Sequence, residues 1–148
     1  MPALRDDWTL AAANAALPRV RTLLADARKH AAVLREEQAH LNDLRAIHGD
    51  QVLAPAGEGH QEFARRLARF NAERDLYLAV LGRFEALGVE VKDVEQGLVD
   101  FRGAVAGRKA YLCWRDGEAA IGHWHELDTG FAGRKRIPAP ADAPGRRG

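Results

Sequence analysis

The sequence has little of several features that mark common classes of protein. Cys113 is its only cysteine among 148 residues, so no intramolecular disulfide can form and a reducing, cytoplasmic compartment is expected. No apolar run approaches the ~20 residues of a membrane span, and we expect no signal peptide at the N-terminus. Basic residues number 22 against 21 acidic ones, which predicts no strong attraction to nucleic acid or to a membrane surface.

Motifs that specify a reaction are also missing. The chain has no glycine-rich phosphate loop, no nucleophile elbow and no zinc-protease motif, so whether it is an enzyme stays open. Its length and its 47% content of apolar residues suit one domain with one core. We expect a single domain over residues 1–137 and a disordered tail, rich in proline, alanine and glycine, over 138–148.

Two long helices are predicted, over 8–48 and 58–87. Apolar residues recur at helical spacing in both segments. Thr9 is a suitable N-cap for the first helix, Pro18 is expected to kink it, and Gly88 is suited to end the second. The intervening break at 48–59 is short, which favours an antiparallel helical hairpin.

The second helix carries an aromatic residue every seven positions, in the series Phe63, Phe70, Tyr77 and Phe84. A lone hairpin leaves part of such a seam uncovered, so we expect a homodimer that pairs the helices into a four-helix core. Glu37 and His40 are three positions apart on the first helix, which is the spacing of the carboxylate and imidazole ligands that one helix supplies in di-iron bundles. A charged boundary of the first helix is the favoured interpretation of that pair.

The segment 89–127 is predicted to form a small sheet, because short alternating stretches are separated by turn residues. The fold class is therefore α+β: a long antiparallel helical hairpin with a small antiparallel β-sheet, as a hairpin or meander, in the C-terminal third. Asp116-Gly117 predicts a tight turn that pairs Trp114 with Ala119. That register places His123 and His125 on the face of Trp114.

Cys113 would then lie on the opposite face, as a buried structural thiol. The two histidines on one strand face could begin a Zn²⁺ or Fe²⁺ site, with Glu118, Asp100 or Asp128 as an oxygen ligand. Because H-x-H has no fixed spacing to further ligands, a hydrogen-bonded His125 and a solvated His123 remain the alternative.

A wider set of polar and aromatic residues could form a pocket for a small polar ligand. The set comprises Lys92, Asp100, Trp114, Glu118, Trp124, His125 and Arg134. The same residues could instead form a structural network that joins the sheet to the helices.

Three stretches, "GVEVKDVEQGLVDF", "YLCWRDGE" and "IGHWHELDTGFAGR", resemble a prokaryotic family known as domain of unknown function 2203. "WTLAAANAALPRV" is similar to the opening of that family. The resemblance implies no activity, but it directs attention to the C-terminal sheet. The family often has an aromatic residue at position 123 and a proline at position 102, where this chain has His123 and Arg102.

The sequence thus favours a metal- or small-ligand-binding module centred on the C-terminal sheet. The alternative is a non-catalytic dimeric interaction or scaffold protein that uses the helical hairpin. No nucleic-acid or membrane partner is expected, and no protein partner is identified.

Overall fold

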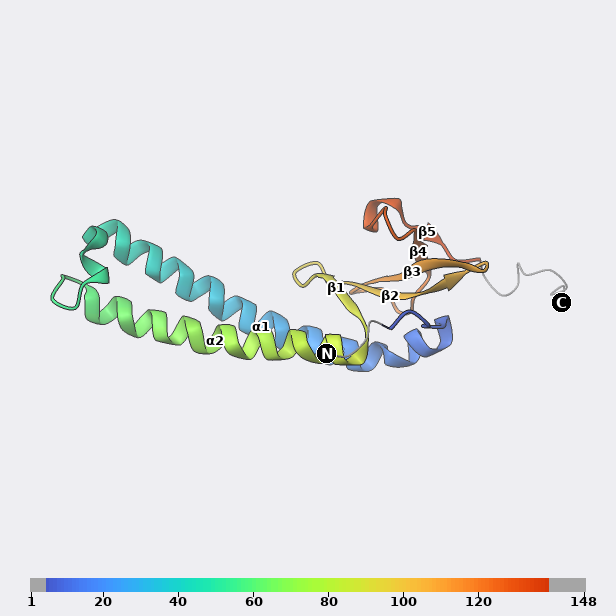
Figure 1. The fold of residues 1–148 in the computed structure, drawn as a ribbon, viewed down its shortest axis with the longest axis horizontal. Coiled ribbons are helices and arrows are strands. Elements are labelled where there is room, and N and C mark those ends of the chain that lie inside the picture. Colours follow the sequence, from blue (N-terminus) through green and yellow to red (C-terminus); the bar gives the residue numbers. More distant parts are fainter. Residues whose placement is uncertain (1–4, 139–148) are drawn as a thin grey trace, which may run out of the picture. The chain divides into compact units, whose positions relative to one another are not determined.

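The computed structural model describes residues 5–138 as two long helices followed by a five-strand antiparallel sheet, an α+β fold as expected (Figure 1). The tail expected to be disordered falls, from residue 139 on, outside the described residues. The chain forms two compact units. We call residues 25–83 the hairpin unit, and residues up to 24 together with those from 84 on the sheet unit.

The helices are α1 (Leu10–His48) and α2 (His60–Leu87), with the short 3₁₀ helix η1 (Gly49–Leu53) after α1. The expected cap is confirmed, since the Thr9 hydroxyl oxygen accepts a hydrogen bond from the Ala12 amide at 3.1 Å. Gly88 ends α2 in the left-handed region, at φ 87°, where a side chain would be strained. Within the described part of the chain, no helix combines the length and apolar character needed to cross a membrane.

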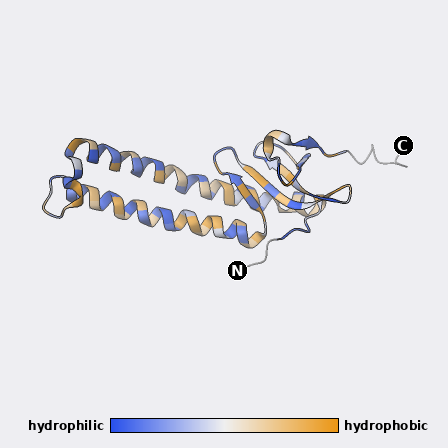
Figure 2. Ribbon diagram, turned by 45° about the horizontal axis from the view of Figure 1, so that its top comes forward, coloured by the Kyte–Doolittle hydropathy of each residue, from blue (hydrophilic) through white to orange (hydrophobic). Residues whose placement is uncertain are grey.

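Charged groups join the two helices of the hairpin unit. His30 Nδ1 lies 2.7 Å from Glu73 Oε2. Glu37 is fully buried, with Arg66 Nη1 at 3.2 Å and Arg69 Nε at 3.4 Å. The expected charged boundary of α1 thus differs at Glu37, which is buried between the helices, where Arg66 and Arg69 of α2 neutralise its charge. Figure 2 shows hydrophilic and hydrophobic residues alternating along both helices.

The strands are β1 (Glu90–Asp93), β2 (Leu98–Val105), β3 (Arg108–Arg115), β4 (His123–His125) and β5 (Lys135–Arg136), paired in chain order. One face of the sheet carries the buried apolar side chains Val99, Phe101, Leu112 and Trp114. The first turns of α1 cover this face: the Arg21 guanidinium lies 5.5 Å from the Trp114 ring centre. β5 is too short to leave a periodic pattern, and the sequence did not indicate it.

The expected register between β3 and the following strand is wrong. Tyr111 pairs with His125, and Cys113 with His123. Asp116 and Gly117 do form a turn, but the chain then runs through a loop before β4 begins at His123. This shifts the pairing by three residues, and an odd shift moves every side chain to the other face. Both histidines therefore share a face with Cys113 and not with Trp114.

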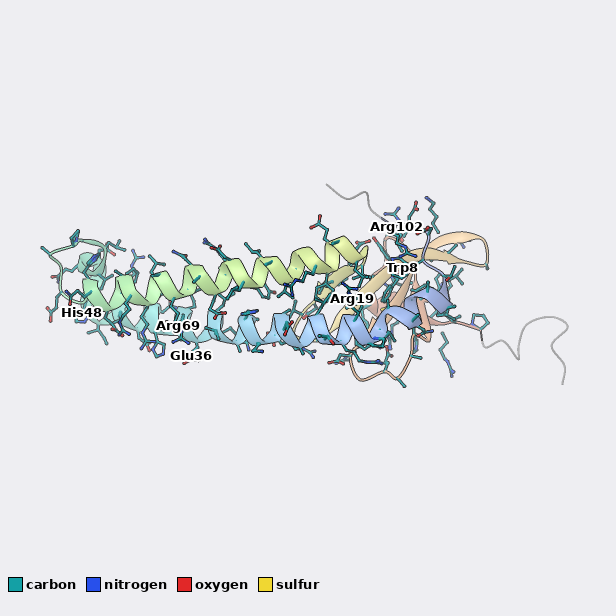
Figure 3. The ribbon with its side chains drawn as sticks, turned by 90° about the horizontal axis from the view of Figure 1, so that it is seen from below. Trp8, Arg19, Glu36, His48, Arg69 and Arg102 are labelled. Atoms are coloured by element: carbon teal, nitrogen blue, oxygen red, sulfur yellow. The ribbon has the colours of Figure 1, made fainter. Side chains whose placement is uncertain are left out.

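An N-terminal segment completes the sheet unit. The Trp8 amide donates to the Arg102 carbonyl at 3.1 Å, and Trp8 forms an isolated parallel bridge with Gly103 (Figure 3). A Cβ atom on Gly103 would lie 2.1 Å from the Trp8 carbonyl oxygen. Position 103 thus requires glycine for the two backbones to approach.

Candidate metal centre

Three buried residues of different chemistry meet on the sheet face opposite Trp114. Asp100 comes from β2, Cys113 from β3 and His125 from β4, and their exposed fractions are 2%, 1% and 2%. One potential ligand atom from each lies within 4.8 Å of the others. Among the described residues this is the one such group, and it could hold a metal ion.

Hydrogen bonds fix the orientation of the His125 ring. Its Nδ1 lies 2.8 Å from the Glu126 carbonyl oxygen, and its Nε2 lies 2.9 Å from Asp100 Oδ2. A carbonyl oxygen can only accept, so Nδ1 carries a hydrogen and Nε2 faces the group. A histidine that donates Nδ1–H to a backbone carbonyl is a frequent arrangement for a metal ligand bound through Nε2.

Asp100 and His125 share one further proton. Either His125 Nε2 or Asp100 Oδ2 must donate in the hydrogen bond between them. The pair is therefore a carboxylate with an imidazolium, or a carboxylic acid with a neutral imidazole. Burial raises the pKa of the Asp100 carboxyl above its ordinary value, although the nearby His125 acts in the opposite direction. The pair therefore has a proton to give up when a cation binds.

The arrangement does not suit a cysteine nucleophile. Burial, assisted by the Asp100 charge, raises the pKa of the Cys113 thiol to about 12, so the thiol is protonated at neutral pH. Both nitrogens of His125 are already engaged, and neither is free to accept the thiol proton. A metal ion removes this obstacle, since a coordinated thiol is deprotonated by the ion itself.

A cavity of about 240 Å³ opens onto the three residues. It is lined by Lys92, Leu98, Asp100, Tyr111, Cys113, His125, Leu127, Gly130 and Phe131. Glu90 Oε1 accepts hydrogen bonds from the Lys92 ammonium at 2.9 Å and from the Tyr111 hydroxyl at 3.0 Å. One charged side chain and several apolar ones thus surround the potential ligands.

A second polar cluster flanks Cys113. Arg134 Nη1 lies 3.9 Å from the Cys113 Sγ, and the same guanidinium binds both oxygens of the Glu118 carboxylate. His123 Nδ1 lies 3.6 Å from Glu118 Oε2, and it is buried without a hydrogen-bond partner. Glu118 also accepts from the Arg115 amide at 2.8 Å, so this cluster anchors the loop after β3.

The other predicted site residues lie apart from the cavity. Trp114 is buried on the opposite face, where its Nε1 donates to the Glu118 carbonyl at 2.9 Å. Trp124 lies on that same face, with the Lys135 ammonium 5.0 Å from its ring centre. Asp128 is exposed and does not belong to the group of three. Of the predicted ligand-binding set, Lys92, Asp100 and His125 line the cavity.

Sequence reasoning missed Cys113 because of the register. A usable signal was present, since the correct pairing aligns Trp124 with Leu112 and so places apolar side chains together on one face. The same pairing places Cys113 on the face of His125. Matching of apolar side chains does not fix it alone, because the two-residue turn would align Leu112 with Ile121, which is also apolar.

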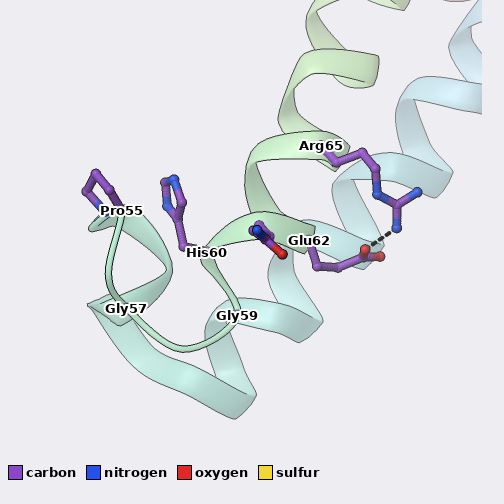
Figure 4. Close-up of a pocket in the computed structure, with 7 residues that line it drawn as sticks. Pro55, Gly57, Gly59, His60, Glu62 and Arg65 are labelled. Atoms are coloured by element: carbon purple, nitrogen blue, oxygen red, sulfur yellow. Dashed lines mark hydrogen bonds and ion pairs between the residues drawn. The ribbon is translucent and has the colours of Figure 1, made fainter.

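A larger hollow of about 760 Å³ lies in the hairpin unit, around the start of α2 (Figure 4). Its charged groups are paired, since Glu62 pairs with Arg65, and His60 Nδ1 bonds the Val52 carbonyl at 2.7 Å. It contains no cluster of metal-ligating side chains among the described residues. The sheet unit is therefore the better candidate for a site.

Residues 7–137 match the model of a family described as an uncharacterized conserved protein, DUF2203. The chain belongs to the DUF2203 family. No curated protein and no solved structure matches it. The resemblance seen in the sequence is thereby confirmed.

Proposed function

We propose that this DUF2203 protein binds one divalent transition-metal ion of the zinc type through Asp100, Cys113 and His125. The observation that carries the proposal is the convergence of three buried ligand atoms around an imidazole whose Nδ1 is held by a carbonyl oxygen. Sulfur, nitrogen and oxygen ligands together suit Zn²⁺ and Fe²⁺. Three protein ligands and one open position are typical of zinc sites that bind further molecules.

Metal content of the untagged, full-length protein tests the proposal. We expect about one Zn²⁺ or Fe²⁺ per chain in protein purified without chelators. Loading with Co²⁺ should produce the near-ultraviolet charge-transfer band of a cobalt–thiolate bond. A metal content near zero, together with no such band after loading, would contradict the proposal.

Two matched pairs of variants locate the site. Cys113→Ser preserves the shape of the side chain and should abolish the charge-transfer band while the protein stays folded. On β4, His125→Asn should weaken metal binding by about tenfold or more, whereas His123→Asn should not, because His123 lies outside the group. If His125→Asn fails to fold, Cys113→Ser still decides: a folded Cys113→Ser protein with wild-type affinity overturns the proposal.

A second proposal concerns the hairpin unit, which we infer pairs with a second copy of the chain. Three aromatic residues of the heptad series, Phe63, Phe70 and Tyr77, are only half-buried. Leu67 and Leu78 beside them are 38% and 54% exposed. This supports the alternative of a dimeric scaffold protein and is compatible with a metal site in the sheet unit.

A further inference from the structure

We propose that the cavity in the sheet unit binds a small carboxylate with a short apolar body, one oxygen on the metal and the other held by Lys92. This inference rests on the metal site proposed above. It adds the class of molecule that would occupy the remaining coordination position.

The position of the cavity is the first support. All three proposed ligands, Asp100, Cys113 and His125, contribute to its lining. Three protein ligands leave one position of a tetrahedral ion open, and residues 5–138 offer no further ligand atom in the group. The cavity is therefore the space from which an outside ligand reaches the ion.

Charge is the second support. Among the lining residues outside the metal group, Lys92 is the one with a charged side chain. Its ammonium lies 4.8 Å from the Tyr111 ring centre and donates to Glu90, a bond that uses one of its three N–H groups and leaves the others for a further acceptor. Burial acts to lower the pKa of Lys92, but the hydrogen bond and the charge of Glu90 outweigh it, so the pKa lies above its ordinary value and the lysine stays charged. A carboxylate in the cavity would contact the Lys92 ammonium with one oxygen and the metal ion with the other.

Size and apolar character define the remainder of the ligand. At about 240 Å³ the cavity is smaller than the pockets that hold drug-sized molecules. Leu98, Leu127 and Phe131 supply apolar lining, and the Arg134 guanidinium fixes Phe131 from 4.5 Å. A carboxylate with a tail of a few carbons fills such a space, whereas a highly charged or bulky anion does not.

Titration of the cobalt-loaded full-length protein with acetate, propionate and butyrate tests the inference. In a buffer without coordinating anions, each acid should change the visible bands of Co²⁺ in a saturable way. Affinity should rise about fourfold per methylene group because each one enters an apolar cavity. Neutral 1-butanol should leave the bands unchanged at the same concentrations.

Lys92→Met should weaken butyrate binding at least tenfold, because a charge-assisted hydrogen bond is lost. Lys109→Met is the matched control: it removes a lysine of β3 that pairs with Asp6 and does not line the cavity, so affinity should not change. The cobalt–thiolate band shows in each variant that the metal site is intact.

The outcomes separate the two proposals. Absence of the cobalt–thiolate band overturns the metal site and this inference with it. If the band is present but butyrate leaves the visible spectrum unchanged, the metal site stands and the carboxylate inference is wrong. Equal affinity for acetate and butyrate, an unchanged Lys92→Met protein, or tighter binding of inorganic phosphate would each also overturn it.

Discussion

At the residue scale, the chemistry of the site depends on which groups surround a few buried side chains. Cys113 illustrates this, since the residue type alone says nothing of its role. Its neighbours Asp100 and Arg134 come from strands and loops far from it in the sequence. The sequence identified Asp100 and His125 as candidates, but their convergence with Cys113 depends on strand pairing and was not predictable residue by residue.

Metal binding should release two protons per ion. One comes from the Cys113 thiol, and the other is the proton shared by Asp100 and His125; the ion requires thiolate, carboxylate and neutral imidazole. Lys92 and Arg134 face the group as cations and keep their charge. Calorimetry of Zn²⁺ binding in buffers of different protonation enthalpy measures the number. A release of zero protons at neutral pH would contradict the assignment.

Glu118→Gln should destabilise the protein by about 2 kcal/mol at neutral pH, because Glu118 then no longer forms a charge-assisted pair with Arg134. Burial acts to raise the pKa of Glu118, but the hydrogen bonds from Arg134 and the Arg115 amide outweigh it, and the pKa lies below the ordinary 4.5. A lowered pKa means that this stabilisation is present above pH 4.5 and is lost as the pH falls through the folded-state value.

Urea unfolding at several pH values measures the effect. The wild-type protein should lose stability on acidification more steeply than Glu118→Gln does. Glu126→Gln is a suitable control, because Glu126 is more exposed and its nearest cations, on Lys135 and Arg108, lie 3.8 and 3.9 Å away. Equal acid sensitivity of all three proteins would refute the role of Glu118.

At the element scale, the helices could be predicted closely and the sheet only in part. Local signals fix a helix, as Thr9 and Gly88 show, since an N-cap and a left-handed glycine act within one turn. Strand pairing depends on loop length, and the sequence around Asp116-Gly117 is equally compatible with a two-residue hairpin turn. Burial of Glu37 was not predictable either, because its partners belong to the other helix.

The ion pairs of the hairpin unit should respond unequally to substitution. Arg66→Met leaves Glu37 buried with only Arg69 beside it, and should destabilise the protein strongly. Glu37→Leu should cost less, since Arg66 still pairs with Glu62 at 3.0 Å and an apolar side chain fills the buried position. Thermal unfolding followed by circular dichroism ranks the two variants, and the opposite order would contradict this account.

At the scale of the whole molecule, the sheet unit is built from both ends of the described chain, and the hairpin unit lies between them in sequence. A hairpin of two helices buries a smaller share of its apolar surface than a four-helix core does. This is why we expect self-association to involve the hairpin unit.

Light scattering at micromolar concentration should give the mass of a dimer. Leu67→Asp combined with Leu78→Asp should produce a monomer, because these residues lie three turns apart on one side of α2, beside the aromatic seam. Leu76→Asp is the matched control: Leu76 is 50% exposed, but helical periodicity places it on the opposite side. A monomeric wild-type protein would exclude the dimer.

The contact between Trp8 and Gly88 within the sheet unit bears on the order in which the chain folds. The Trp8 indole donates to the Gly88 carbonyl, 80 residues later, so closing this contact in an unstructured chain costs considerable loop entropy. The ion pairs between α1 and α2 close most of that loop locally. The hairpin unit thus shortens the search between Trp8 and Gly88, and substitutions that break the ion pair between Glu37 and Arg66 should slow assembly of the sheet as well.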